Sequence, residues 1–137
     1  MEIRGLCPLL GVFDMPRSVR FYCDNLGFEI HQRSATYAVE DGVELFHWAW
    51  LKRDDAELML NTAYDEGERP NLESPMRIAA HQDTTLYLGC PEVDGAYEEL
   101  KAKGVSCKPP QTAWYGMRQL EMRDPDGFGV VLQWRAK

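Results

Sequence analysis

The sequence predicts an α+β protein in which two β-α-β-β-β modules form a curved, partly open mixed β-sheet with helices on the outside. Three observations support this prediction. The order strand, helix, strands occurs twice in the chain of 137 residues. The glycines that end the two predicted helices, Gly27 and Gly104, stand at corresponding positions of the two halves. The chain also closes with the signature of a β-hairpin. We expect a single domain, 1–137, composed of module one at 3–61, a linker at 62–83 and module two at 84–137.

Module one begins with a predicted strand at residues 3–13, where apolar residues follow one another without a helical period. Asp14 then occupies an N-cap position, and Pro16 stands in the first helical turn, where a missing N–H does no harm. Apolar residues recur along this helix at spacings of four, three and four until Gly27, which provides the stop. The strands expected after the helix are 28–33, 44–52 and 56–61.

Module two repeats this order. A predicted strand at 86–90 leads into a helix that opens at Pro91 and ends at Gly104. The segment Asp124–Gly127 predicts a tight turn, because proline fixes φ and Asp-Gly tolerates positive φ. The strands expected after the helix are 105–108, 118–123 and 128–134. The linker is polar, but a long connection without structure is uncommon, so we expect a short helix at 76–80.

Composition excludes several classes of function. The net charge of −7 argues against a nucleic-acid partner, which would need a basic surface. No apolar run is long enough to span a membrane, and the N-terminus lacks the pattern of a secretory signal. The four cysteines are widely spaced, so we expect reduced thiols rather than a disulfide framework or a zinc site. These features predict a cytoplasmic protein without membrane or nucleic-acid partners.

Two groups of motifs make the chain resemble the vicinal oxygen chelate superfamily, which holds glyoxalases, extradiol dioxygenases and bleomycin-resistance proteins. The motifs are Pro8–Met15, Ser18–Tyr22 and Leu26–Glu29 in the first half, and Val93–Leu100, Gly104–Val105, Trp114–Arg118 and Asp124–Gly127 in the second. The resemblance covers nearly the whole chain, apart from residues 62–83 and the region around 34–43. It implies the glyoxalase/bleomycin-resistance fold, with paired modules that are often exchanged between the subunits of a homodimer.

The same resemblance implies where a metal would bind. In the metal-using members, four inward-facing side chains hold one divalent ion, and their positions fall at Cys7, Glu57, Thr85 and Val131 of this chain. Only Glu57 among them is a donor that oxygen- and imidazole-loving ions prefer. The resemblance therefore implies the metal-free, ligand-sequestering branch of the bleomycin-resistance proteins, and we expect no metal and no cofactor.

The aromatic residues of the third expected strand and of the second module's loop are candidate ligand contacts. Phe46, Trp48 and Trp50 alternate and so share one face of a strand, either as an aromatic wall for a flat ligand or as core or subunit interface. Trp114 and Tyr115 precede Gly116 in a loop that would cover a ligand cup or cap a hydrophobic edge. With the charged candidates, the predicted ligand-binding residues are Trp48, Trp50, Glu57, Trp114, Tyr115 and Arg118.

Two charged residues complete the predicted site. Glu57 lies in the middle of an apolar strand, where desolvation would raise its pKa unless a cation such as Arg118 paired with it. It would then recognise a cationic ligand or act as a general base, and the plainer alternative is a salt-bridged or solvent-facing glutamate. Arg118 would hold an anionic group or be paired structurally.

Three functions remain open from the sequence. The leading hypothesis is a homodimeric bacterial protein that sequesters an aromatic or cationic small molecule, such as an antibiotic, in a sheet-lined cup without metal. The alternative is a lyase, isomerase or dioxygenase of the same superfamily, with a divergent metal site or with Glu57 as the catalytic base. A third is an interaction module in which the aromatic residues form a subunit interface. One scaffold hosts many functions, so the fold cannot choose among them.

Overall fold

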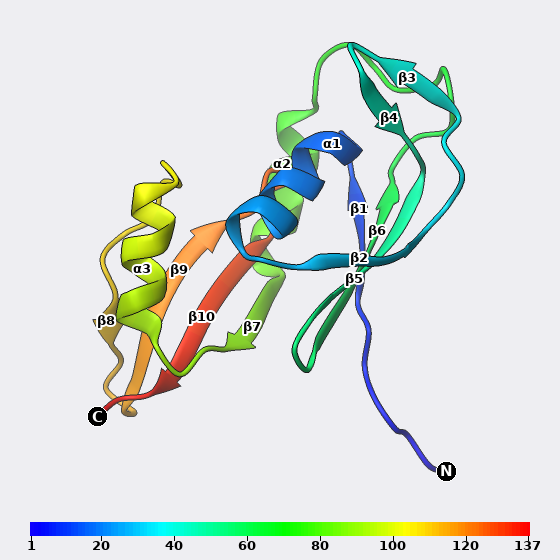
Figure 1. The fold of residues 1–137 in the computed structure, drawn as a ribbon. Helices are drawn as coiled ribbons and strands as arrows, with labels where there is room; N and C mark the ends of the chain where they lie inside the picture. The colour runs from blue at the N-terminus through cyan, green and yellow to red at the C-terminus, as the bar shows by residue number, and fades with distance from the viewer. The chain divides into compact units, whose positions relative to one another are not determined.

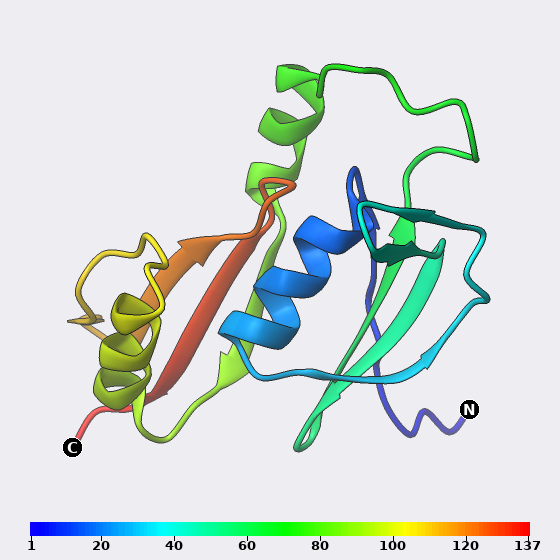
Figure 2. The same cartoon turned by 45° about the horizontal axis from the view of Figure 1, so that its top comes forward.

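The computed structural model describes residues 1–137 and confirms the α+β prediction. The chain divides into two compact units, unit 1 at Met1–Glu73 and unit 2 at Ser74–Lys137. Each unit contains its own four-stranded mixed sheet together with helices, as Figures 1 and 2 show. None of the helices has both the length and the apolar composition that crossing a membrane requires.

Unit 1 contains a helical segment and a sheet in the order β1-β6-β5-β2, in which β1 runs parallel to β6 and the other pairs are antiparallel. A small separate hairpin, β3–β4, follows β2 along the chain. The elements are β1 (Leu9–Val12), α1 (Met15–Val19), the π-helical turn η1 (Arg20–Asn25), β2 (Glu29–Arg33), β3 (Ala38–Glu40), β4 (Val43–Leu45), β5 (Trp48–Arg53) and β6 (Ala56–Thr62).

Unit 2 repeats this topology, with the sheet order β7-β10-β9-β8 and with β7 parallel to β10. Its first element, α2, confirms the short helix predicted in the linker. The elements are α2 (Pro75–Ala80), the 3-10 turn η2 (His81–Asp83), β7 (Thr85–Gly89), α3 (Val93–Ala102), β8 (Gln111–Thr112), β9 (Met117–Arg123) and β10 (Gly129–Arg135).

The core of unit 1 lies on the side of the sheet that α1 covers. The strands β5 and β6 alternate, so that every second side chain points toward the helix and is removed from water. Those buried side chains are Ala49, Leu51, Leu58 and Leu60. The helix starts as predicted, because the Asp14 side chain accepts a hydrogen bond from the Arg17 backbone N–H at 3.3 Å. Gly27 follows the helical segment at φ +78°, as expected of a stop glycine.

The structure differs from the predicted strands in several places. The first strand pairs only over β1, so residues 3–8 lie outside it. The predicted strand at 105–108 is irregular; Pro109 and Pro110 have no N–H to donate, and the chain joins the sheet only at β8. The hairpin β3–β4, in the region around 34–43, was not predicted. Phe46, expected on the strand face of Trp48 and Trp50, precedes β5 and is buried.

Candidate functional site

Three of the predicted ligand contacts lie on one surface, which we call the open face of unit 1. It is the face of β5 and β6 opposite the buried leucines. Lys52 and Glu57 are directly paired across the two strands, and Trp48 and Trp50 alternate with the buried residues of β5. The structure therefore brings Trp48, Trp50 and Glu57 together on this face.

Lys52 links the aromatic and acidic residues of the open face. Its ammonium Nζ lies 4.6 Å from the centroid of the Trp50 ring and 3.2 Å from Glu57 Oε1. Sequence reasoning missed Lys52, although its position two residues after Trp50 on the same strand places it on the same face. The face thus holds a cation between an aromatic ring and a carboxylate.

Trp50 also contributes a hydrogen-bond donor that the protein does not satisfy. The His31 ring packs edge-on against the Trp50 ring, with centroids 4.6 Å apart. The indole Nε1 is shielded from solvent and has no hydrogen-bond partner. Such uncompensated donors are rare in native proteins and are typical of sites with a functional role.

Glu57 forms an ion pair within its own unit. The sequence offered Arg118 as one example of a cationic partner; the structure pairs Glu57 with Lys52, and the glutamate side chain remains 34% exposed. A half-exposed ion pair contributes little to stability, about 0–1 kcal/mol. The pair is therefore easily exchanged, which suits a residue that binds a cation from solution.

Cys7 and the remaining metal positions do not form a metal site. Partial burial raises the pKa of the Cys7 thiol, and the negative charge of Glu57 raises it further, against a smaller lowering by Lys52. Such burial is typical of structural, unreactive cysteines. Val131 offers no donor atom, and no three His, Cys, Asp or Glu side chains converge anywhere in the chain. These residues do not fit a divalent ion.

In unit 2, the predicted contacts Trp114 and Tyr115 precede β9 and pack edge-on, with ring centroids 5.4 Å apart. Trp114 is 95% exposed. Gln119 donates through Nε2 to the Tyr115 hydroxyl and to Gln133 Oε1, both at 2.9 Å. These residues form a neutral hydrogen-bonded row, in contrast to the charged open face of unit 1.

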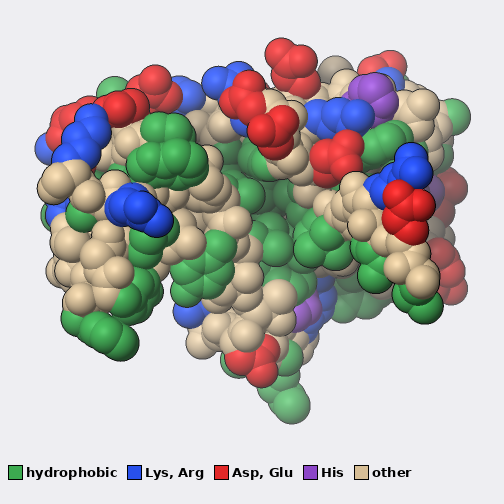
Figure 3. Space-filling model, turned by 90° about the horizontal axis from the view of Figure 1, so that it is seen from below, with side chains coloured by type: hydrophobic (Ala, Val, Ile, Leu, Met, Phe, Trp, Pro, Cys, Tyr) green, Lys and Arg blue, Asp and Glu red, His purple; other side chains and the backbone are tan.

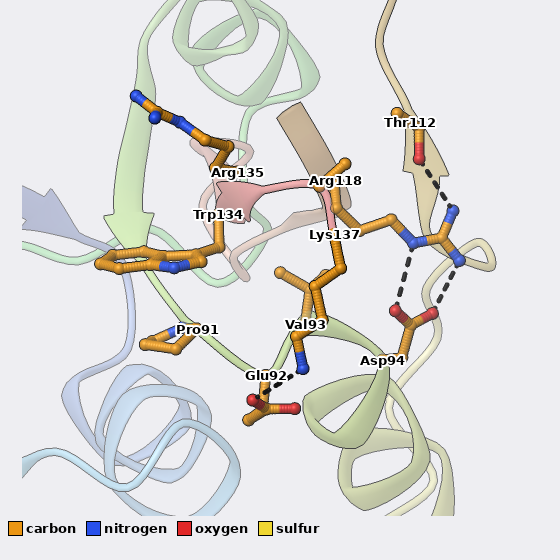
Figure 4. A pocket seen from close by; sticks show the side chains of 10 residues that line it. Pro91, Glu92, Val93, Asp94, Thr112, Arg118, Trp134, Arg135 and Lys137 are labelled. Carbon is orange, nitrogen blue, oxygen red and sulfur yellow. Dashed lines mark hydrogen bonds and ion pairs between the residues drawn. The ribbon is translucent and has the colours of Figure 1, made fainter. Parts of the chain in front are cut away.

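Arg118 lies in a different place from Tyr115 and Gln119. It lines a cavity of about 290 Å³ with the start of α3 and the end of β10, shown in Figure 4. Its guanidinium forms two hydrogen bonds to the Asp94 carboxylate, at 2.7 and 3.2 Å, which raise the pKa of Arg118 and lower that of Asp94. Adjacent residues of a strand point to opposite faces, so Arg118 and Gln119 do not share a site.

On the face drawn in Figure 3, acidic and basic side chains are interspersed with hydrophobic ones. A nucleic-acid interface would instead present a continuous basic patch or stripe.

Comparisons with known proteins identify the family and the fold. The sequence profile of the Glyoxalase/Bleomycin resistance protein/Dioxygenase superfamily matches residues 7–132. A bleomycin resistance protein of Geobacillus stearothermophilus is 31% identical over 128 residues, which cover 87% of each chain. A bleomycin resistance protein of Staphylococcus aureus has the same identity and coverage.

Solved structures show the same fold at lower sequence identity. The bleomycin-binding protein of Streptomyces verticillus, complexed with copper(II)-bleomycin, superimposes with a TM-score of 0.65 and 22% identity, covering 100% of this chain and 98% of that one. An antibiotic-binding protein from another Streptomyces superimposes with a TM-score of 0.70 and 21% identity, covering 99% of both chains.

Proposed function

The chain belongs to the Glyoxalase/Bleomycin resistance protein/Dioxygenase superfamily, and we propose from this that it is a binding protein that sequesters an aromatic, cationic small molecule without a metal. The observation that carries the proposal is the row formed by Trp50, Lys52 and Glu57 on the open face of unit 1. The bleomycin-binding and antibiotic-binding proteins of similar fold support a small-molecule ligand.

The row explains how a cation would be recognised. Lys52 already places its own ammonium over the Trp50 ring and against the Glu57 carboxylate. A ligand cation that displaced this ammonium would gain both contacts, and the attraction of a cation for an aromatic face is worth about 0.5–2 kcal/mol. The aromatic part of the ligand would then pack on Trp48 and Trp50. We assign Glu57 a binding role and no catalytic step.

The predicted contacts in unit 2 are Trp114, Tyr115 and Arg118. Trp114 and Tyr115 stay predictions, with an exposed ring available for stacking. Arg118 is engaged by Asp94 within unit 2. The predicted homodimer is retained as a proposal, since twofold dimers are the commonest assembly among soluble homo-oligomers. Light scattering coupled to size exclusion measures that state.

Calorimetric titration with bleomycin, in buffer containing a chelator, tests the proposal. We expect binding by the wild-type chain, and about tenfold weaker binding by Trp50→Ala and by Glu57→Gln, because each loses a contact to the cation. Lys52→Met should bind at least as tightly, since the competing ammonium is gone. Glu121→Gln, an exposed glutamate on β9 of unit 2, is the matched control.

Two results would contradict the proposed function. One is that neither bleomycin nor other cationic aromatic compounds bind the wild-type chain. The other is that Trp50→Ala and Glu57→Gln bind as tightly as Glu121→Gln, which would place the ligand elsewhere.

A further inference from the structure

Unit 1 has a second concave surface, a cavity of about 480 Å³ that we call the hairpin pocket. Its walls come from the start of α1, the hairpin β3–β4 and residues 62–69. We propose that the hairpin pocket is a second small-molecule site, separate from the open face, and that its ligand is a planar organic cation. Its volume lies within the range of about 300–1,000 Å³ that is typical of small-molecule sites.

The hairpin pocket lies on the opposite side of the sheet from the open face. Thr62, at the end of β6, alternates with Asn61 and so points to the same side as the buried Leu60. His47 joins it there through a hydrogen bond of 2.9 Å between Nδ1 and Thr62 Oγ1. Trp50 and Glu57 point the other way, so a ligand in the hairpin pocket does not touch them.

Two aromatic pairs form the apolar part of the hairpin pocket. The rings of Tyr37 and His47 are stacked, with centroids 4.1 Å apart and planes inclined by 6°. Tyr37 nevertheless remains 38% exposed. Phe13 and Tyr64 pack edge-on, with centroids 6.0 Å apart. A flat ligand that stacked on Tyr37 would extend an aromatic pair that already exists.

Carboxylates predominate among the charged groups that line the hairpin pocket. Asp14 caps α1 through its contact with the Arg17 N–H, and the other acidic residues are exposed, one at the end of β3 and the rest in loops. An excess of carboxylates lowers the local potential and favours cations over anions. The acidic lining residues are Asp14, Glu40, Asp41, Asp65 and Glu66, against the basic Arg20 and Arg69.

Arg69 shows which kind of cation this lining accommodates. Its guanidinium carbon lies 5.2 Å from the centroid of the Phe13 ring, and its Nη1 donates to the Phe13 carbonyl at 3.5 Å. Arg17 places its guanidinium over the same ring, at 5.7 Å. A planar, delocalised cation stacks on aromatic faces better than a compact ammonium does. The protein thus already supplies a planar cation to the wall of the pocket.

One wall of the hairpin pocket, the start of α1, belongs to the duplicated unit, but the other two walls do not. The hairpin β3–β4 belongs to the region around 34–43, and the opposite wall belongs to residues 62–69, both outside the family-like motifs of the sequence. Unit 2 has no hairpin between its helix and β9 beyond the short strand β8. The pocket is therefore specific to unit 1.

Proflavine, a planar aromatic cation, is a suitable probe. The NMR signals of His47 report on the hairpin pocket separately from the open face. We expect proflavine to shift the imidazole signals of His47 in a saturable way, and the shift to persist in Trp50→Ala, which removes the open-face contact. Fluorescein, a planar anion, should leave His47 unchanged. In a variant carrying Asp41→Asn, Asp65→Asn and Glu66→Gln, the Kd read from His47 should rise about five- to tenfold.

The charge variant alters only exposed side chains, so a weaker His47 response does not result from unfolding. A second variant, Tyr37→Leu, removes the stacking surface and should weaken proflavine binding by a similar factor. The proposal is overturned if His47 does not respond to proflavine, if fluorescein shifts it equally, or if the charge variant keeps the wild-type Kd. None of these results bears on bleomycin binding through Trp50 and Glu57, so the two proposals fail independently.

Discussion

The two units share one topology but use the turn between their last two strands differently. In unit 1 the turn between β5 and β6 is exposed, and Asp54 adopts φ +49° there with an ion pair to the neighbouring Arg53 at 3.5 Å. In unit 2 the corresponding turn, Asp124–Gly127, is mostly buried, with Asp124 and Asp126 among the least exposed polar residues of the chain.

The buried turn of unit 2 is fixed by two kinds of contact. Asp124 Oδ1 accepts hydrogen bonds from the backbone N–H groups of Asp126 and Phe128, both at 2.9 Å. The segment α2–η2 then docks on the turn: Arg77 Nη1 donates to Asp126 Oδ1 at 2.6 Å, and the His81 ring stacks on Phe128 at 4.0 Å. A repeated element thus serves as a simple connection in one copy and as an anchor in the other.

The two units also differ in the exposure of a characteristic ion pair. Unit 1 displays its ion pair between Lys52 and Glu57 on the open face, where it is half exposed. Unit 2 places the pair of Arg77 and Asp126 inside the anchor, where the aspartate side chain has 0% exposure. Breaking an exposed ion pair costs little free energy, whereas breaking a buried pair leaves one buried charge without a partner. Of these two pairs, Lys52–Glu57 is therefore the more easily exchanged, and Arg77–Asp126 contributes more to stability.

Removing the cation of each pair gives the largest expected effect. Arg77→Met should lower the free energy of unfolding by about 3–5 kcal/mol, because Asp126 loses a charged partner inside the protein. The matched variant, Lys52→Met in unit 1, should change it by less than about 1 kcal/mol. Urea denaturation of both variants measures the difference. Equal losses would mean that the two pairs are equivalent and that the proposed division of roles is wrong.

The turn glycines give the next largest effect. A Cβ at Gly127 would lie 2.5 Å from the Ile78 carbonyl oxygen, and its φ is +92°, so Gly127→Ala should cost about 2–4 kcal/mol. Gly42, in the hairpin β3–β4 of unit 1, has φ +78° with nothing within 4 Å of its Cβ position. Gly42→Ala should cost about 1 kcal/mol, from the backbone alone. Equal decreases in the melting temperatures of Gly127→Ala and Gly42→Ala would show that α2 is not packed against the turn as described.

The sequence predicted the turn of unit 2 but not its anchoring. Asp-Pro-Asp-Gly is a local signal, since proline and glycine set the backbone angles of the residues that carry them. The partners of the turn, Arg77 and His81, come from a segment that the sequence identified only as a linker with a short helix. Contacts between residues so far apart have no local signature, so burial of the turn had to come from the structure.

The same limit applies to the candidate site. Strand alternation was enough to group Trp48 and Trp50, and it also contained the information that would have added Lys52. Pairing across strands was not available, so Glu57 was given Arg118 as a possible partner instead of Lys52. The strand expected at 105–108 is absent, and the chain joins the sheet only at β8, after Pro109 and Pro110.

The helix starts provide the smallest and most direct comparison of the two units. Asp14 at the N-cap of α1 accepts from the Arg17 N–H, whereas Glu92 at the N-cap of α3 makes no such bond. Asp14→Ala should therefore cost about 1 kcal/mol of unfolding free energy, and Glu92→Ala only a few tenths. Glu92→Ser supplies the missing acceptor to α3 and should stabilise the protein by about 0.5–1 kcal/mol.

These three variants can be measured by chemical denaturation under one set of conditions. The only other interaction of the Glu92 side chain is its exposed ion pair with Lys137 at 3.3 Å, which adds little to stability. The expected order of stability is Glu92→Ser, wild type, Glu92→Ala, Asp14→Ala. An equal loss in the two alanine variants would show that the Asp14 carboxylate does not cap α1. The start of unit 1's helix would then depend on packing alone, as that of unit 2 does.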